Sequence, residues 1–159
     1  MNLPEWVRFQ DEFDDAIISV DLLARLMQPV EREPLLWKWI IIAAHNALQG
    51  AMVCALSGTD GTGALGDASA RKVLDWLRTQ DGPHPEPWMA DFPLLVDRAR
   101  DAQRVRDGPP LILSDDEVRD LDRLNRLRRG AMHFTPKGWS IEPRVCLALS
   151  CWRSQGWSN

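Results

Sequence analysis

The sequence predicts an all-α protein, an up-and-down bundle of four to five helices. In several segments apolar residues recur every three or four positions, which is the period of a helix with one buried face. No segment alternates apolar and polar residues for long enough to indicate a strand, and no internal repeat is visible. At 159 residues and 45% hydrophobic composition, the chain can form one core. We therefore expect a single domain over residues 1–159.

Two helices are predicted in the first third of the chain. Residues 13–28 place Phe13, Ile17 and Val20 on one apolar stripe, with aspartates off that stripe. Residues 34–56 are apolar nearly all round, Pro34 suits a first helical turn, and Gly58 follows the end. A helix that is apolar on every side is buried, so this second segment is the expected central helix.

The central segment also has to be considered as a membrane span. Residues 39–56 carry no formal charge over 18 positions, close to the lower length for crossing a bilayer. However, His45, Asn46 and Gln49 lie at its centre, where polar groups are costly, and no basic flank orients it. We expect a buried helix and no membrane association.

Two shorter helices are predicted beyond this segment. A small, polar, glycine-rich loop over residues 57–66 precedes a helix at 68–78, which we expect to bury Val73, Trp76 and Leu77. Residues 81–87, DGPHPEP, interrupt helical structure. Helical spacing resumes over residues 91–106, and Gly108 with two prolines closes that helix.

A further helix is predicted to begin after Ser114. Ser114 and Glu117 have the spacing of a capping box, in which each side chain satisfies a free backbone amide at the helix start. Val118, Leu121 and Leu124 mark the buried side, which continues through Leu127 or Ala131. We expect the segment TPKG at 135–138 to end this helix and Pro143 to open a last one.

A glycine motif in the loop matches the dinucleotide fingerprint GxGxxG. The motif is Gly61, Gly63 and Gly66, and Asp81 follows at about the distance of the ribose-binding acid. The fingerprint functions after a strand, whereas a long helix precedes it here. We therefore interpret it as a flexible connection between helices and expect no cofactor.

Charge and cysteine content restrict the classes of function. A net charge of −4 gives no long-range attraction to nucleic acid, so any RNA contact requires a local patch. Cys54, Cys146 and Cys151 make an odd count without a CxxC pair, which fits neither a disulfide framework nor a zinc site. The acidic N-terminus lacks the features of a secretory signal, so a reduced cytoplasm is the expected location.

The helix after Ser114 begins with acidic residues and ends with arginines. This order complements the helix dipole, and Asp115 with Arg119 and Asp122 with Arg126 have the spacing of ion pairs along one face. Most of these arginines therefore need no functional role. His133 could likewise only hydrogen-bond the last carbonyl groups of the helix.

The helix end nevertheless carries a recognisable motif. The run LRRGAMHFTPKGWSIE, residues 127–142, resembles the Arg-x-x-x-x-His signature of HEPN domains, with Arg128 and His133 at the two defining positions. Residues 36–59, which contain AAHNALQGAMVCAL, look similar to an earlier helix of bacterial HEPN-like proteins. The two stretches together cover about a quarter of the chain.

The resemblance implies a helical bundle that dimerises and brings two such helix ends into one cleft. In its active members the activity is metal-independent cleavage of RNA, in toxins or phage defence, and toxins of this kind pair with an antitoxin protein. Histidine can move a proton near neutral pH, and a guanidinium can hold a phosphate. We expect Arg128 and His133 to be catalytic, no metal ligand, and substrate binding by Arg129, Asn125, His45 and Gln49.

Two departures from the family pattern concern the residues around the motif. Active members commonly carry a small polar residue after the arginine, where this chain has Arg129. The tyrosine that is modified in some toxins is replaced by Thr135, and the chain has no tyrosine. On an ideal helix Arg128 and His133 point about 140° apart, whereas Arg129 and His133 share a face, so Arg129 competes for the catalytic position.

Two alternatives remain open from the sequence. His45, Asn46 and Gln49 must face polar groups, either within the core, where they would be structural, or in a cleft. The whole chain is either a ribonuclease or a non-catalytic HEPN-like module that binds a nucleotide, RNA or a protein partner. The RNA target, the partner and the biological trigger are not encoded in any motif that we recognise.

Overall fold

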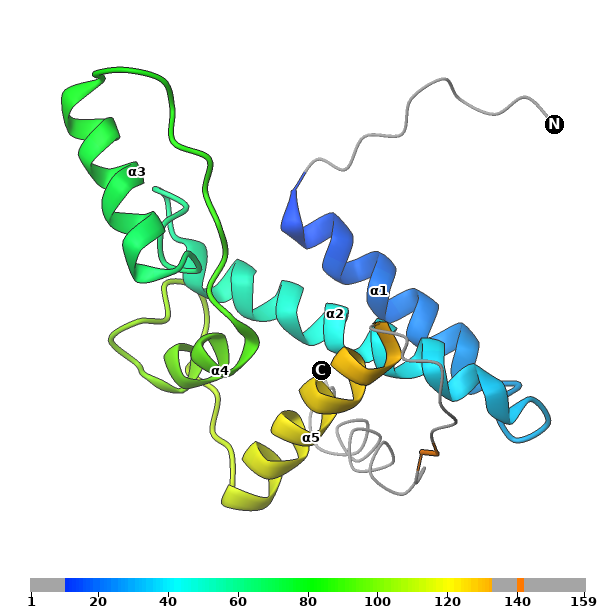
Figure 1. Cartoon of the computed structure of the whole chain (residues 1–159). Helices are drawn as coiled ribbons and strands as arrows, with labels where there is room; N and C mark the ends of the chain where they lie inside the picture. The colour runs from blue at the N-terminus through cyan, green and yellow to red at the C-terminus, as the bar shows by residue number, and fades with distance from the viewer. Residues whose placement is uncertain (1–10, 133–139, 142–159) are drawn as a thin grey trace, which may run out of the picture. The chain divides into compact units, whose positions relative to one another are not determined.

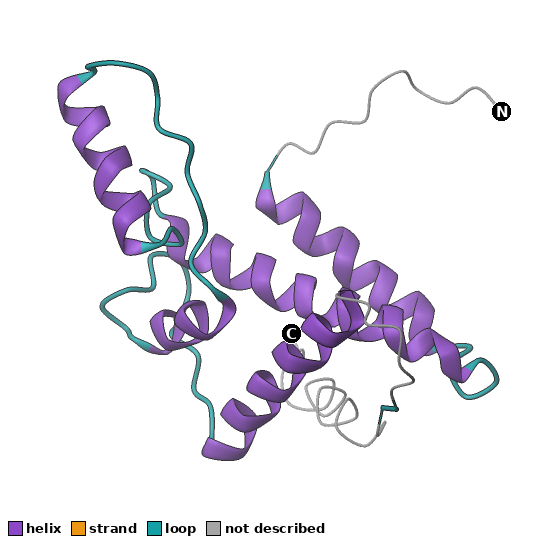
Figure 2. Ribbon diagram, viewed as in Figure 1, coloured by secondary structure: helices purple, strands orange, loops and turns teal. Residues whose placement is uncertain are grey.

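The computed structural model of the chain describes residues 11–132 and 140–141 (Figure 1). Within them lie a 3-10 helix, η1 (Pro34–Leu36), and the α-helices α1 (Glu12–Met27), α2 (Trp37–Ser57), α3 (Asp67–Thr79), α4 (Phe92–Arg100) and α5 (Asp115–Met132). Figure 2 shows no strand in this part of the chain, where one isolated β-bridge joins Leu65 and Met89. The prediction of an all-α protein is confirmed.

The chain divides into two compact units, and the division falls inside α1 and inside α2. The first unit is Met1–Ser19 with Asn46–Leu111, and the second is Val20–His45 with Ile112–Asn159. The helix predicted to begin at Pro143 and the helix end predicted at 135–138 lie outside the described residues. The single domain over residues 1–159 stays a prediction.

The first unit contains a close contact between α1 and α2. A Cβ atom added at Gly50 would lie 2.8 Å from Cβ of Ala16, so the absence of a side chain at Gly50 permits this approach. Most of the buried apolar side chains of this unit come from α2 and α4. They are Ala16, Ala47, Met52, Val53, Leu56, Ala64, Val73, Ala90, Phe92, Leu95, Val96 and Ala99.

The glycine-rich loop after α2 is held in place by Arg98 of α4. The guanidinium of Arg98, on a residue only 6% exposed, donates to the carbonyl oxygens of Gly63 and Leu65 at 2.9 and 2.6 Å. It also pairs with Asp67 at 2.6 Å. The preceding element is the helix α2, so the dinucleotide fingerprint lacks its strand. The prediction that this loop connects two helices is confirmed. The prediction of flexibility did not take account of the three bonds from Arg98.

Two sequence predictions in this unit are wrong in detail. The helix predicted to reach residue 106 ends at Arg100, because the backbone N–H groups of Arg106 and Asp107 donate to the carbonyl oxygen of Ala55 instead. In α3, Val73 is buried as predicted, whereas Trp76 is half-buried and Leu77 is 44% exposed. The buried face of α3 is therefore narrower than its apolar residues predicted.

The second unit packs the first half of α2 with α5. Its buried apolar side chains are Val30, Trp37, Ile40, Ile41, Ala43, Ala44, Leu121, Leu124 and Ala131. The predicted capping box opens α5, since the backbone N–H of Ser114 donates to the Glu117 carboxylate at 2.8 Å and that of Glu117 donates to Ser114 Oγ at 3.3 Å. The Ser114 hydroxyl also donates to this carboxylate, and the two bonds from Ser114 lower the pKa of Glu117.

The ion pairs along α5 agree only partly with those predicted from the sequence. Arg126 pairs with Asp122 at 3.5 Å, as predicted. Arg119 pairs with Asp116 instead of Asp115. Three- and four-residue spacings place side chains on the same helix face, so either aspartate is within reach.

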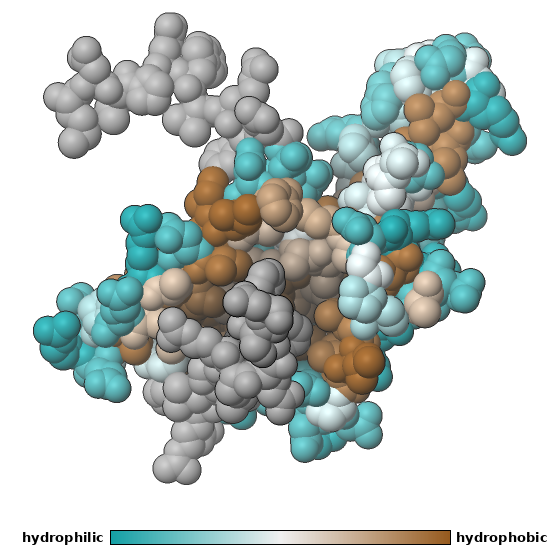
Figure 3. All heavy atoms as spheres, turned by 180° about the vertical axis from the view of Figure 1, so that it is seen from behind, coloured by the Kyte–Doolittle hydropathy of each residue, from teal (hydrophilic) through white to brown (hydrophobic). Residues whose placement is uncertain are grey.

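One helix, Pro34–Ser57, is long and apolar enough to cross a membrane by length and composition alone. Its most apolar window is 56% buried, and the core helix of a soluble protein passes the same test. Large apolar side chains are also exposed on α1 and elsewhere, and Figure 3 shows apolar patches on one face. In the second unit they are Val20, Leu22, Leu35, Trp39, Ile112 and Met132.

Candidate functional site

Three of the predicted site residues meet in the second unit. His45 lies on α2, and Asn125 and Arg128 lie one turn apart on α5. Apolar residues such as Ile41 and Leu124 are buried where these helices pack, and the polar side chains beside them are buried as well. His45 is 2% exposed and Asn125 is 7% exposed, so the core encloses a polar pair.

His45 and Asn125 form a hydrogen bond across 80 positions of sequence. Nε2 of His45 lies 3.3 Å from Oδ1 of Asn125. An amide oxygen can only accept, so Nε2 carries the proton and the lone pair of the neutral ring is on Nδ1. The sequence left open whether His45 faces the core or a cleft, and the structure places it in the core.

The surroundings of His45 keep its imidazole neutral. Burial and the positive charge of Arg128 together lower the pKa of His45 from 6.5 to about 4, although the bond with Asn125 acts in the opposite direction. Both dominant causes disfavour the imidazolium, because burial removes its hydration and Arg128 repels it. The ring therefore remains uncharged throughout the neutral pH range.

Arg128 differs from its neighbours on α5. The residue is half-buried, and its Nε is a buried donor with no hydrogen-bond partner among the described residues. Arg119 and Arg126 each pair with an aspartate, whereas Arg128 forms no ion pair within that part of the chain. A guanidinium without a compensating carboxylate is suited to binding an anion.

The remaining predicted residues are placed differently. Arg129 is exposed on α5, and Gln49 belongs to the first unit. His133, the predicted catalytic histidine, lies outside the described residues. The angle between Arg128 and His133 therefore stays a prediction, and so does the competition between Arg128 and Arg129.

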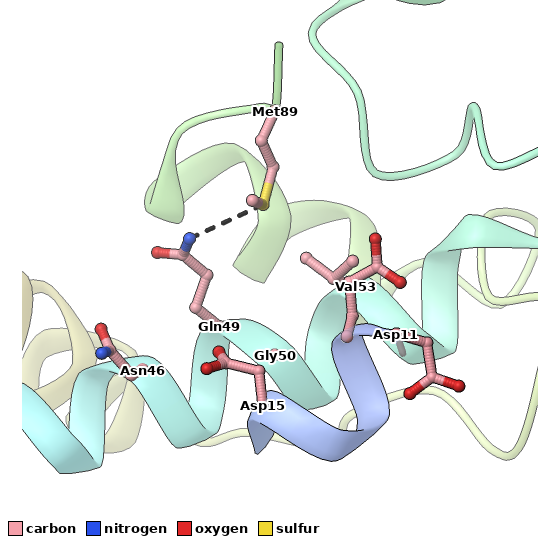
Figure 4. Close-up of a pocket in the computed structure, with 8 residues that line it drawn as sticks. Asp11, Asp15, Asn46, Gln49, Gly50, Val53 and Met89 are labelled. Carbon is pink, nitrogen blue, oxygen red and sulfur yellow. Dashed lines mark hydrogen bonds between the residues drawn. The ribbon is translucent and has the colours of Figure 1, made fainter. Parts of the chain in front are cut away.

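The first unit contains a separate pocket of about 580 Å³ where α1 faces α2 (Figure 4). Asp15 of α1 and Asp11, just before that helix, line the pocket on one side, and Asn46 and Gln49 line it from α2. The Gln49 amide donates to the sulfur of Met89 at 3.6 Å. Three carboxylates line the pocket, counting Glu12, and they would repel a phosphodiester. We therefore do not place RNA in this pocket.

Across residues 11–132 and 140–141, no three His, Cys, Asp or Glu side chains gather in a way that could hold a metal ion. Models of protein families, curated proteins and solved structures gave no match to the chain. The HEPN resemblance rests on the two sequence stretches alone.

Sequence reasoning did not foresee two features of these residues. It named His45 and Asn125 separately as substrate-binding residues, and it did not pair them. It also gave no role to Arg98, the buried arginine of the first unit. A charged residue within an apolar helix face was the available signal, since Arg98 lies between Leu95 and Ala99 in α4.

Proposed function

We propose that this protein is a metal-independent endoribonuclease of toxin or phage-defence type, with an HEPN-like helical bundle that acts as a homodimer in the cytoplasm. The observation that carries the proposal concerns the burial and the ion-pair partners of Arg128. Its guanidinium is half-buried and has no ion-pair partner in the described part of the chain. It lies five residues before His133, at the positions of the HEPN motif.

The proposed reaction needs only a phosphate-binding cation and proton transfer. The ribose 2′-oxygen loses its proton and attacks the adjacent phosphorus, and the bond from phosphorus to the 5′-oxygen breaks as that oxygen gains a proton. The products carry a 2′,3′-cyclic phosphate and a 5′-hydroxyl. Arg128 binds the phosphate and stabilises the charge that develops on it. His133 from one subunit accepts the first proton, and its copy donates the second.

The assignment of proton transfer to His133 follows from the properties of His45. With a pKa of about 4 and 2% exposure, His45 is a weak base at neutral pH and is not accessible to a ribose. An efficient general base has a pKa near the working pH. We therefore assign proton transfer to His133 and not to His45.

Exposed apolar residues support the part of the proposal that concerns partners. The second unit exposes Val20, Leu22 and Trp39, at 46% or more each. Exposed apolar residues of this size often belong to interfaces. A second copy of the chain would cover such a surface and supply the second His133. An antitoxin protein is the other partner that the toxin proposal includes.

A non-catalytic module that binds a nucleotide, RNA or a protein partner is the second candidate. The closed bond between His45 and Asn125 favours it, because both side chains are buried and engaged with each other. In this case the same residues support the α2–α5 packing. Arg128 would then bind an anion or a partner carboxylate without chemistry.

Cleavage of RNA by His133→Ala tests the proposed function. Purified wild type and the variant are incubated with mixed RNA in excess chelator, and product ends are analysed. We expect wild type to produce 2′,3′-cyclic phosphate ends and the variant to be at least about 100-fold slower, the contribution of one acid–base group. Equal yields from the two proteins, with melting temperatures matched, would refute the enzymatic proposal.

A further inference from the structure

The buried pair of His45 and Asn125 lies near the positive charge of Arg128 and carries no negative charge to neutralise it. Arg128 follows Asn125 by three residues on α5, so their side chains lie on neighbouring turns of one face. The charge of Arg128 is near enough to act on the His45 ring. Both members of the pair are uncharged near neutral pH, since Asn125 is an amide and since burial and the charge of Arg128 disfavour the charged form of His45.

Burial prevents the pair from touching a polymer directly. His45 and Asn125 are 2% and 7% exposed, whereas the half-buried Arg128 reaches the surface. Polar groups are costly to bury, and an apolar pair of similar size would fill the same space without that cost. Any effect of the pair on a bound polymer therefore passes through the residue beside it, Arg128.

We infer that His45 and Asn125 are positioning residues that place polar groups without negative charge near the Arg128 guanidinium, and so leave it available to a phosphodiester. The inference rests on the proposed function and gives both residues a role different from the substrate binding that the sequence predicted. The important property is the amide at position 125. A carboxylate there would pair with Arg128 and would also raise the pKa of His45.

The test is a double-mutant cycle on binding of an uncleavable ligand, a 2′-O-methyl RNA oligonucleotide. We expect Asn125→Asp to weaken binding about tenfold, which is the scale of losing one charge-assisted phosphate contact. Arg128→Ala should weaken it similarly. The double variant should bind no more weakly than Arg128→Ala alone, because the carboxylate acts only through the guanidinium.

The outcomes separate this inference from the proposed function. Additive losses in the double variant, or wild-type affinity in Asn125→Asp, would overturn the inference even if wild type cleaves RNA. A non-additive cycle in a protein that cleaves no RNA would support the inference and refute the ribonuclease. If wild type does not bind the oligonucleotide, both fail.

A spectroscopic measurement keeps the inference testable if Asn125→Asp does not fold. Long-range ¹H–¹⁵N spectra of histidine-labelled wild type report which ring nitrogen carries the proton. We expect His45 to be the neutral tautomer with its proton on Nε2 near neutral pH. A proton on Nδ1, or a charged ring, would contradict the proposed arrangement.

Discussion

Replacing Gly63 with alanine is expected to lower the free energy of unfolding by about 3 kcal/mol or more, at the upper end of the cost of overpacking. A Cβ atom at this position would lie 1.8 Å from the carbonyl oxygen of Leu56. That oxygen belongs to the backbone of α2, so no side-chain rotation can relieve the clash. The loop would have to move, and the bond from Arg98 to the Gly63 carbonyl oxygen would be disturbed.

Gly130→Ala is the matched control for this substitution. Gly130 lies in α5, and a Cβ there meets no described atom within 4 Å. Alanine favours helices over glycine, so we expect the control to be neutral or to stabilise by up to about 1 kcal/mol. Urea unfolding of both variants measures the difference. Equal stability of the two variants would show that the loop does not pack against Leu56.

Acid is expected to remove stability that depends on His45. The folded pKa of His45 is about 4, below the ordinary 6.5. Above 6.5 the ring is neutral in both states and contributes nothing to the pH dependence. As the pH falls toward 4, the unfolded chain binds a proton that the folded chain does not. The resulting loss is complete near the folded pKa and amounts to roughly 3 kcal/mol.

Comparison with His45→Gln isolates this contribution, because both proteins share all other titrating groups. Unfolding free energies are measured in urea near pH 7 and near pH 4.5. We expect the advantage of wild type over the variant to shrink by roughly 2–3 kcal/mol between the two conditions. An advantage that is constant with pH would mean that His45 is not held neutral by burial and by Arg128.

Features encoded locally could be predicted from the sequence. The helices α1 and α5 follow from apolar periodicity, α2 follows from a long apolar segment between Pro34 and Gly58, and the capping box follows from two residues three positions apart. The end of α4 could not be predicted, because the N–H groups of Arg106 and Asp107 bond to Ala55, about fifty positions earlier. Helix propensity contains no information about a hydrogen-bond partner so far away in the sequence.

The candidate site shows the same limit. The sequence established that a histidine inside an apolar helix must have a polar partner, and it identified the arginine motif on α5. It could not pair His45 with Asn125, because that bond depends on how α2 and α5 pack. For the same reason, the sequence could not distinguish Arg128, half-buried and without an ion pair among the described residues, from the paired Arg126.

The rate of RNA cleavage by Arg128→Ala at saturating RNA, in chelator, tests the central claim most directly. Arg126→Ala is the control for loss of a surface charge, and Arg129→Ala tests the competing position. We predict a loss of about 100-fold or more for Arg128→Ala, as for removal of a group that stabilises the transition state, and little change for Arg126→Ala. A wild-type rate in folded Arg128→Ala would contradict the account, and the loss appearing in Arg129→Ala instead would assign the phosphate to Arg129.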